Sequence, residues 1–249
     1  MTKPLFACDI DNTLIYSHRH PHEGWECVEW LQGQEQSYVS PETKRELIRL
    51  SPWLTPVPVT SRTAGQYLRL KMPVPIRLAL TGNGADLLSE GRPDGAWRTE
   101  TDALIAPWRA EMRRCLALLE NVGGCLRVAN ADDAYLYAVF QDTSEAALWA
   151  GTLESKTNLE VVASGRKLYL LPPPLNKGRA VSRLMARNGY THLIAAGDSP
   201  LDLPMLRMAN TAIAPHALRG CLPANARICP EGGLFSRFVV QTVLECIRK

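Results

Sequence analysis

The sequence predicts an α/β protein whose mainly parallel sheet is interrupted by an inserted α+β domain. Short apolar runs alternate with stretches of helical periodicity in the first and last thirds of the 249 residues, as in βαβ units. The block 86–175 has 9 Lys and Arg against 13 Asp and Glu, about −4, whereas the remainder carries about +7. This step in charge predicts a core domain formed by 1–85 and 176–249 and an insert formed by 86–175.

The first part of the core alternates strands and helices. "LFACDI" has the apolar character of a buried strand, and Ser40 followed by Pro41 is a signal for the start of a helix. Asn83-Gly84 is a turn signal. The elements expected here are a strand at 5–10, an irregular or hairpin-like stretch at 16–39, a helix from Pro41, a strand at 55–59, a helix at 65–72 and a third strand before Asn83.

The insert and the last part of the core are interpreted in the same way. The insert begins with a hairpin around 90–95 and continues with one long amphipathic helix, 102–122. Alternating apolar residues then predict strands, and wider apolar spacing predicts helices. The remaining elements are strands at 125–130, 134–141, 159–164, 167–173, 192–198 and 211–215, and helices at 144–155, 176–189, 200–209 and 234–249.

Composition and charge narrow the functional classes. Hydrophobic residues make up 46% of the chain and charged residues 21%, which is typical of a globular protein with a real core. A net charge of +3 gives no reason to expect nucleic acid or an anionic membrane as a partner. No apolar stretch approaches the roughly 18 residues of a membrane span. The seven scattered cysteines indicate reduced thiols in a cytoplasmic protein, and the oligomeric state is left open.

The first predicted strand ends in two carboxylates, Asp9 and Asp11. Residues i and i+2 of a strand share a face, so these two acids are expected to lie close together. Like charges at such a distance repel and raise one pKa, unless a cation or hydrogen-bond donors compensate. The pair therefore predicts a compensating group supplied by other parts of the chain.

Further polar residues stand where other predicted strands end or helices begin. Thr60-Ser61-Arg62 follows the second strand, Lys177 begins a helix, and Asp198 and Asp202 follow a strand of small residues. Taken singly, each has a plain explanation, as a helix cap, a first-turn acid or a solvated lysine. Because ligands of open α/β sheets bind at the carboxyl ends of the strands, all of these residues are expected to converge on one edge.

The combined set has one coherent chemistry. Several carboxylates around a point form a hard oxygen site suited to Mg²⁺, which retains some waters and binds substrate phosphate. A cation there offsets the repulsion between Asp9 and Asp11 and neutralises an incoming phosphate. One aspartate is then able to attack phosphorus and form an aspartyl-phosphate, while the other transfers protons. Lysine and threonine stabilise charge on the equatorial oxygens.

The segments "DIDNTL", "VTSRT", "NKGRA" and "GDSPLDLPML" resemble, in this order, the four motifs of the haloacid dehalogenase (HAD) superfamily of phosphohydrolases. The resemblance implies a Rossmann-like core with a parallel sheet. It also implies that Asp9 is the nucleophile, that Asp11 is the general acid/base, and that Thr60 and Lys177 hold the transferring phosphoryl group. The Mg²⁺ ligands that it implies are Asp9, the main-chain carbonyl of Asp11, and Asp198, with Asp202 close by or acting through water.

The position of the insert refines the resemblance. An insert that follows the third strand and precedes Lys177 is similar to the type C2 cap of sucrose-phosphatase-like and Cof-like members. "TGNGADLL" resembles the Asn-Gly-Ala turn common there. Ser61, Arg62 and Asn83 are therefore candidates for substrate contact, with a surface arginine and a turn asparagine as the plain alternatives. Leu201 departs from the usual Asn before the last aspartate, and Ser61 from the usual Gly, which leaves the fine geometry open.

These features predict Mg²⁺-dependent hydrolysis of a small organic phosphate monoester, similar to a sugar phosphate. The partner is then a small-molecule phosphate ester, over which the insert closes as a cap. A phosphotransferase or mutase with the same aspartyl-phosphate is one alternative, and a non-catalytic phosphate-binding or signalling module is another. His18, His20 and His22 lack the partners of a zinc site, and contact with the substrate at the mouth of the site is their alternative role.

Overall fold

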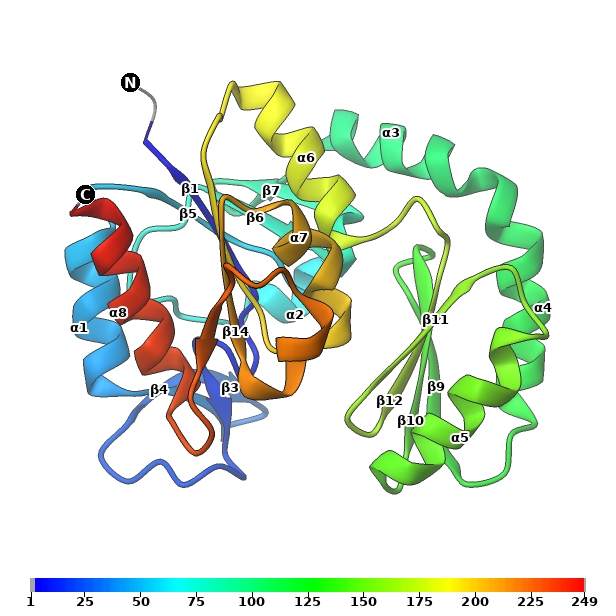
Figure 1. The fold of residues 1–249 in the computed structure, drawn as a ribbon. Coiled ribbons are helices and arrows are strands. Elements are labelled where there is room, and N and C mark those ends of the chain that lie inside the picture. The colour runs from blue at the N-terminus through cyan, green and yellow to red at the C-terminus, as the bar shows by residue number, and fades with distance from the viewer. Residues whose placement is uncertain (1–2, 249) are drawn as a thin grey trace.

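The computed structural model describes residues 3–248, which form a core and a cap (Figure 1). The core contains a five-stranded sheet in the order β15-β14-β13-β1-β5, and every neighbouring pair in it is parallel. The predicted α/β class with a mainly parallel sheet is confirmed. The strands of this sheet are β1 Leu5–Cys8, β5 Thr55–Pro58, β13 Leu193–Ala196, β14 Thr211–Pro215 and β15 Arg227–Cys229.

Helices cover both faces of this sheet. They are α1 Pro41–Leu50, the short α2 Ala64–Tyr67, α6 Lys177–Asn188, α7 Leu203–Met208 and α8 Phe235–Ile247. Alternate residues of β1 point to opposite faces: Phe6 belongs to the buried cluster with α1 and α8, whereas Ala7 belongs to that with α6 and α7. Ser40 caps α1 by accepting a hydrogen bond from the Thr43 main-chain N–H at 3.1 Å.

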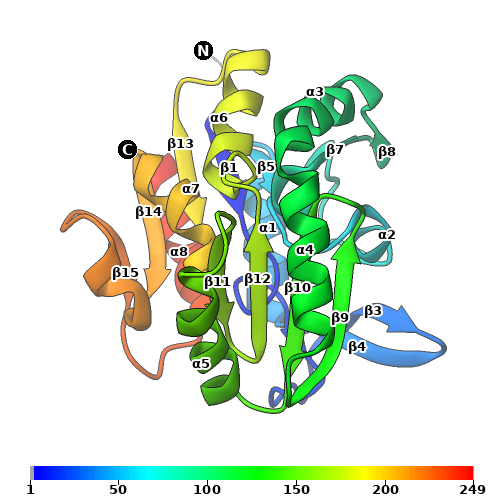
Figure 2. The ribbon, with the colours of Figure 1, turned by 90° about the vertical axis from the view of Figure 1, so that its right-hand side faces the viewer.

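The stretch 16–39 forms a small antiparallel sheet beside the end of β1. Its strands are β2 Tyr16–Ser17, β3 Glu26–Leu31 and β4 Gln34–Val39, in the order β2-β4-β3. Gln32 and Gly33 join β3 to β4, and both have positive φ, 52° and 77°. Two such residues form the tight turn that matches the twist of paired strands. A β3–β4 hairpin therefore lies at the bottom of the core in Figure 1 and projects from it in Figure 2.

The first residues of the predicted insert pack on the core. β6 Leu78–Thr81, β7 Asp86–Ser89 and β8 Arg92–Pro93 form an antiparallel sheet, and α3 Gly95–Ile105 follows it. Trp97 of α3 is fully buried in the cluster that contains α6, and its Nε1–H donates to the Gly84 carbonyl at 3.0 Å. The boundaries 86–175 stay a prediction, and within them β7 and α3 contact the core.

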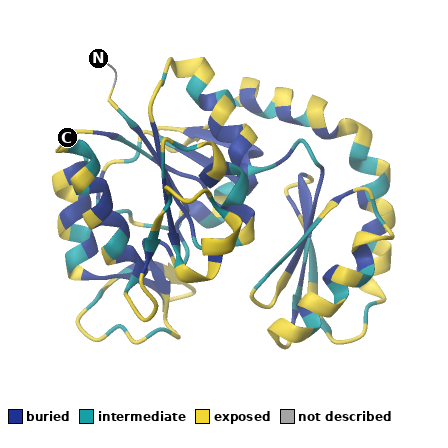
Figure 3. Ribbon diagram, in the orientation of Figure 1, coloured by how far each residue is buried: buried dark blue, intermediate teal, exposed yellow. Residues whose placement is uncertain are grey.

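An antiparallel sheet of four strands and two helices form the cap, as Figure 2 illustrates. The strands are β9 Cys125–Ala131, β10 Tyr135–Phe140, β11 Glu160–Ser164 and β12 Lys167–Leu171, in the order β11-β12-β10-β9, and the helices are α4 Arg109–Glu120 and α5 Thr143–Glu154. Leu136, Ala138 and Phe140 are buried against these helices. Tyr135 and Tyr137, which alternate with them, therefore lie on the face toward the core. The outer surfaces of α4 and α5 are exposed (Figure 3).

Two predicted helices differ from the structure. The helix expected at 65–72 ends at Tyr67, because the chain then runs beside β3, where the Lys71 main-chain N–H donates to the Val28 carbonyl at 2.8 Å. The single helix expected at 102–122 is divided into α3 and α4 by a 3₁₀ turn, Ala106–Trp108. Pro107 lies in this turn, and proline lacks the N–H that a continuous α-helix requires.

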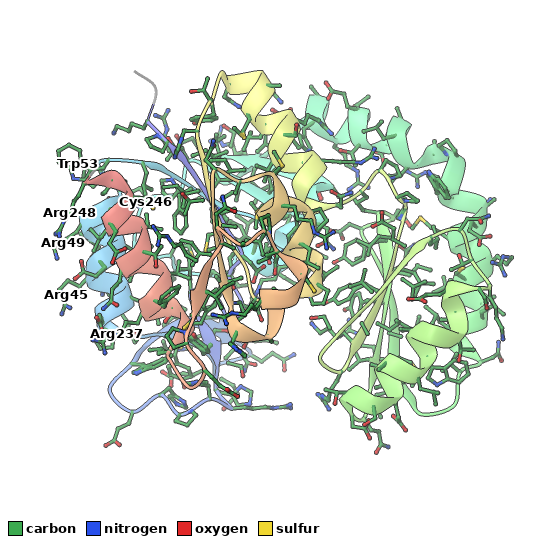
Figure 4. The ribbon with its side chains drawn as sticks, in the orientation of Figure 1. Arg45, Arg49, Trp53, Arg237, Cys246 and Arg248 are labelled. Atoms are coloured by element: carbon green, nitrogen blue, oxygen red, sulfur yellow. The ribbon has the colours of Figure 1, made fainter. Side chains whose placement is uncertain are left out.

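Arginine side chains of α1 and α8 lie at the outer surface of the core, on the side away from the cap (Figure 4). Arg49 forms an ion pair with Glu46, and Arg237 with Glu42. Acidic neighbours thus neutralise much of the positive charge of this surface. Within residues 3–248, no helix combines the length and the apolar character needed to cross a bilayer.

Candidate active site

Residues from all four sequence motifs meet at one edge of the core sheet. Asp9 directly follows β1, Thr60 lies just beyond β5, and Asp198 lies just beyond β13. Lys177 is the first residue of α6. Since β13, β1 and β5 are parallel neighbours, their carboxyl ends open at the same edge of the sheet. Asp9, Thr60 and Lys177 are almost fully buried there.

The Lys177 ammonium group links two carboxylates. Its Nζ donates to Oδ1 of Asp9 at 2.6 Å and to Oδ1 of Asp202 at 2.5 Å, and only 2% of the side chain is exposed. Burial by itself lowers the pKa of an ammonium group, but the charges and hydrogen bonds of Asp202 and Asp9 outweigh it and raise the pKa of Lys177. The lysine is therefore charged and directed at Asp9.

Local sequence features fix the start of α6 and thus the position of Lys177. Asn176 caps the helix, and its side-chain oxygen accepts from the Arg179 main-chain N–H at 2.9 Å. Gly178 allows a close approach to α7, because a Cβ atom at this position would lie 2.4 Å from the Pro204 carbonyl oxygen. "NKG" therefore holds the lysine between the two aspartates.

Three carboxylates, those of Asp9, Asp198 and Asp202, form a cluster in which each offers an oxygen within 4.8 Å of the others. The Thr13 hydroxyl lies 3.4 Å from Oδ2 of Asp9 and 3.4 Å from Oδ1 of Asp198. Burial raises the pKa of Asp9 well above its ordinary value, since Lys177 offsets it only in part. Burial and repulsion from Asp202 raise the pKa of Asp198 to about 7. Lys177 thus supplies one positive charge against three carboxyl groups.

Asp202 already has partners for both of its carboxylate oxygens. Oδ1 accepts from Lys177, and Oδ2 accepts from the main-chain N–H and the hydroxyl of Ser199, each at 2.9 Å. Its neighbour Leu201 is buried in a cluster with Tyr135 and Tyr169 of the cap. An apolar residue suits this position because it packs where the cap meets the core.

Asp11 is held in place by Arg62. With 44% of its side chain exposed, Asp11 accepts a bidentate pair of hydrogen bonds, from Nε and Nη2 of Arg62, each at 2.8 Å. The remaining nitrogen, Nη1, donates to Oε1 of Glu29 at 2.8 Å. Glu29, buried on β3, also accepts from the Ser37 hydroxyl at 2.7 Å and from Arg69 at 3.2 Å. Arg62 therefore ties Asp11 to the β3–β4 hairpin.

Thr60, Ser61 and Asn83 lie in adjoining loops but differ in surroundings. The Thr60 hydroxyl accepts from the Arg62 main-chain N–H at 3.1 Å. The Ser61 carbonyl accepts from the Tyr135 hydroxyl of the cap. Asn83 is 1% exposed, and its main-chain N–H donates to the Thr60 carbonyl at 2.9 Å. Asn83 thus shapes the loop that carries Thr60, and its contact with substrate stays a prediction.

A cavity of about 360 Å³ lies between the core and the cap. Asp11, Ser61 and Arg62 line it on the side of the carboxylate cluster, and Tyr137 and Lys167 line it from the cap. The two parts of the chain therefore enclose a space whose base is formed by motif residues.

Solved structures share this architecture over nearly the whole chain. A sucrose-phosphatase from Synechocystis, in complex with sucrose and phosphate, aligns with a TM-score of 0.66 at 15% identity, over 100% of this chain and 98% of its own. A haloacid dehalogenase-like hydrolase from B. subtilis has a TM-score of 0.60 at 18% identity, over 96% and 98%. The chain has the haloacid dehalogenase fold.

A third structure of this fold, a trehalose-6-phosphate phosphatase related protein, has a TM-score of 0.58 at 15% identity and covers 98% of this chain and 97% of its own. No family model and no curated protein matches the sequence. At such identities the likeness establishes the fold, and it confirms the haloacid dehalogenase architecture that the four motifs predict.

The cap of this haloacid dehalogenase fold contributes residues that sequence reasoning missed. Tyr135, Tyr137 and Tyr169 form a cluster with ring centroids 6.2–6.4 Å apart, and all three line the cavity. Tyr137 and Tyr169 are paired in the β10–β12 register and so share a face. The alternation in "AYLYAVF" was the available signal, because aromatic residues on the face without helices point toward the core. Nothing in the sequence around Glu29 or Arg69 indicated that these residues lie at the site.

Two of the three histidines near β2 form aromatic contacts. His20 stacks on Trp25 with ring centroids 5.4 Å apart, and His22 stacks on Tyr38 at 3.9 Å. His18 lines the cavity. Among the described residues, only Asp9, Asp198 and Asp202 group as metal ligands would.

Proposed function

We propose that the protein is a Mg²⁺-dependent phosphatase that hydrolyses a small organic phosphate monoester through an aspartyl-phosphate on Asp9. One observation carries this proposal. The buried Asp9 carboxylate is bound by a charged lysine, lies beside the carboxylates of Asp198 and Asp202, and is two residues from Asp11, which lines the cavity. A nucleophile, an electrostatic stabiliser and a proton carrier are the groups that this reaction requires.

The carboxylate cluster suits a divalent cation. Oδ2 of Asp9 and Oδ1 of Asp198 share one hydrogen-bond donor, the Thr13 hydroxyl, at 3.4 Å from each. Both oxygens of Asp202, in contrast, accept hydrogen bonds from Lys177 and Ser199. We therefore assign Asp9 and Asp198 as the side-chain ligands, with the Asp11 carbonyl as a third, and Asp202 as the residue that positions Lys177. Bound Mg²⁺ would supply charge neutralisation for the phosphate and the acids.

The reaction then needs two displacements. In the first, a carboxylate oxygen of Asp9 forms a bond to phosphorus while the bond from phosphorus to the leaving oxygen breaks, and Asp11 gives that oxygen a proton. In the second, water attacks the phosphorus and returns a proton to Asp11, which releases phosphate and free Asp9. Lys177 and the Thr60 hydroxyl stabilise the charge on the phosphoryl oxygens. Because Arg62 binds both oxygens of Asp11, one of these hydrogen bonds opens when Asp11 carries the proton.

The dimensions and lining of the cavity favour a small substrate with hydroxyl groups. Its volume of about 360 Å³ lies at the lower end of ordinary ligand pockets. Tyrosines of the cap offer both apolar faces and hydroxyls, which suits a sugar-like carbon skeleton. The similar structure from Synechocystis is a sucrose-phosphatase, with sucrose and phosphate bound, which supports the same substrate class here.

Phosphate release from a panel of phosphate monoesters, with Mg²⁺ and with a chelator, tests this function. We expect inorganic phosphate to be released from some sugar-like phosphates in the presence of Mg²⁺ but not after chelation. Without the cation, the carboxylates of Asp9 and Asp198 would repel the substrate phosphate. Formation of an isomeric sugar phosphate without release of inorganic phosphate would indicate a mutase instead. The absence of turnover on every ester, with phosphate still bound, would indicate a binding module.

A further inference from the structure

The side chains that line the cavity carry a net positive charge. Its Arg, Lys, Asp and Glu side chains are Arg19, Arg62, Arg69, Lys167, Asp11 and Glu29. Arg62 is paired with both acids and Arg69 with one of them. Arg19 and Lys167 form no ion pair with any residue in 3–248. These two cations therefore account for the excess charge.

Arg19 and Lys167 line the cavity from different parts of the fold. Arg19 lies in the core loop just after β2, and Lys167 is the first residue of β12 in the cap. Lys167 Nζ lies 5.9 Å from the ring centroid of Tyr137, which also lines the cavity. Both cations are exposed. Two unpaired positive charges around one small space repel each other, so the arrangement is complementary to an anion between them.

We infer that the leaving group of the substrate carries a second anionic group, a phosphate or a carboxylate, and that Arg19 and Lys167 bind it from the core and the cap. The inference rests on the proposed function, which puts the scissile phosphate at Asp9 and directs the leaving group into the cavity. Charge-assisted hydrogen bonds to phosphate or carboxylate are the strong contacts that these side chains form.

Binding of the second anion would also stabilise the closed position of the cap. Lys167 belongs to the cap and Arg19 to the core, so an anion that contacts both side chains joins the two parts. The Tyr137 ring offers an apolar face to the carbon skeleton between the two anionic groups. A substrate with one phosphate lacks this link and would leave the cap less firmly closed over Asp9.

Matched pairs of substrates test the inference. Fructose 1,6-bisphosphate is compared with fructose 1-phosphate and fructose 6-phosphate for a phosphate group, and 6-phosphogluconate with sorbitol 6-phosphate for a carboxylate. In one of these comparisons we expect kcat/KM to be at least about tenfold higher for the doubly anionic substrate, meaning the one with two separate anionic groups. A tenfold difference corresponds to the free energy of one hydrogen bond to a charged group. Which pair shows the preference identifies the second anion.

Variants then assign the preference to the two cations. Lys167→Ala and Arg19→Ala should each lower kcat/KM for the doubly anionic substrate by about tenfold and for its partner by less than about twofold. Lys156→Ala is the matched control, because Lys156 is an exposed cap lysine outside the cavity and should change neither value. Equal rates within both pairs, or equal losses for both substrates in Lys167→Ala, would overturn the inference.

Equilibrium binding separates this inference from the proposed hydrolysis. Calorimetric titration of the Asp9→Asn protein with the same sugar phosphates, in the presence of Mg²⁺, measures affinity without turnover. Tighter binding of the doubly anionic member, lost in Asp9→Asn combined with Lys167→Ala, supports the anion site even if the wild type hydrolyses no ester. Equal affinities within both pairs refute the site even if the wild type is an active phosphatase.

Discussion

The Asp9→Asn variant should lose phosphatase turnover almost completely, by roughly 10⁴-fold or more in kcat. The side chains are nearly the same size, so the fold should persist, but an amide is not a nucleophile for phosphorus. The change also removes the carboxylate that binds Lys177 Nζ at 2.6 Å. The measurement is phosphate release from the best substrate, with the thermal unfolding of both proteins recorded alongside.

Asp133→Asn provides the matched control for this variant. Asp133 is an exposed residue of the β9–β10 turn in the cap, with φ of 55°, a conformation that asparagine tolerates well. It should retain wild-type turnover and stability. A phosphatase rate in Asp9→Asn close to that of the Asp133→Asn control would contradict the role of Asp9 as nucleophile.

The Lys177→Met variant should lose both turnover and stability. Met fits the space of the lysine stem, but Asp9 and Asp202 would then be buried without their common cation. Breaking a buried ion pair on one side costs about 3–5 kcal/mol of unfolding free energy. Chemical denaturation measures this loss, and phosphate release measures the accompanying loss of turnover.

Two further variants show whether the loss in Lys177→Met comes from the buried charge. Lys44→Met removes a surface lysine, 36% exposed, that pairs with Glu26, and should cost less than about 1 kcal/mol. Adding Asp202→Asn to Lys177→Met removes one uncompensated carboxylate and should recover part of the stability but no turnover. If Lys177→Met and Lys44→Met are equally stable, the buried lysine is not what compensates the acids.

The architecture was predictable because the motifs follow local rules. Apolar runs, the Ser40-Pro41 helix start and the "NKG" start of α6 each act over a few residues. The convergence of Asp9, Thr60, Lys177 and Asp198 follows from parallel strands that end at one edge. These features required no knowledge of how distant side chains pair.

The partners of Asp11 could not be predicted from the sequence. Arg62 was a candidate for substrate contact, and in the structure its guanidinium is bound to Asp11 and Glu29. Glu29 lies on a hairpin whose packing depends on the chain after α2, where a predicted helix ends early. Ion pairs between residues 33 or 51 positions apart have no local signal in the sequence.

The cap residues around the cavity were missed for a similar reason. Tyr135 and Tyr169 are buried because the cap packs on the core, whereas the sequence indicates only that they alternate with apolar neighbours. The sequence around Lys167 indicates only an exposed residue at the start of a strand. Its place in the cavity with Arg19 depends on how the two parts of the fold lie together.

Detection of a phosphoenzyme would show whether Asp9 is the nucleophile. The protein is mixed with its best substrate and Mg²⁺, quenched in acid during turnover, digested, and analysed by peptide mass spectrometry. We expect a phosphoryl group on the Asp9 carboxylate of the "LFACDIDNTL" segment, and none in the Asp9→Asn protein. A phosphoryl group on Asp11 or on any other residue, or rapid turnover with no phosphoenzyme at any quench time, would contradict this expectation.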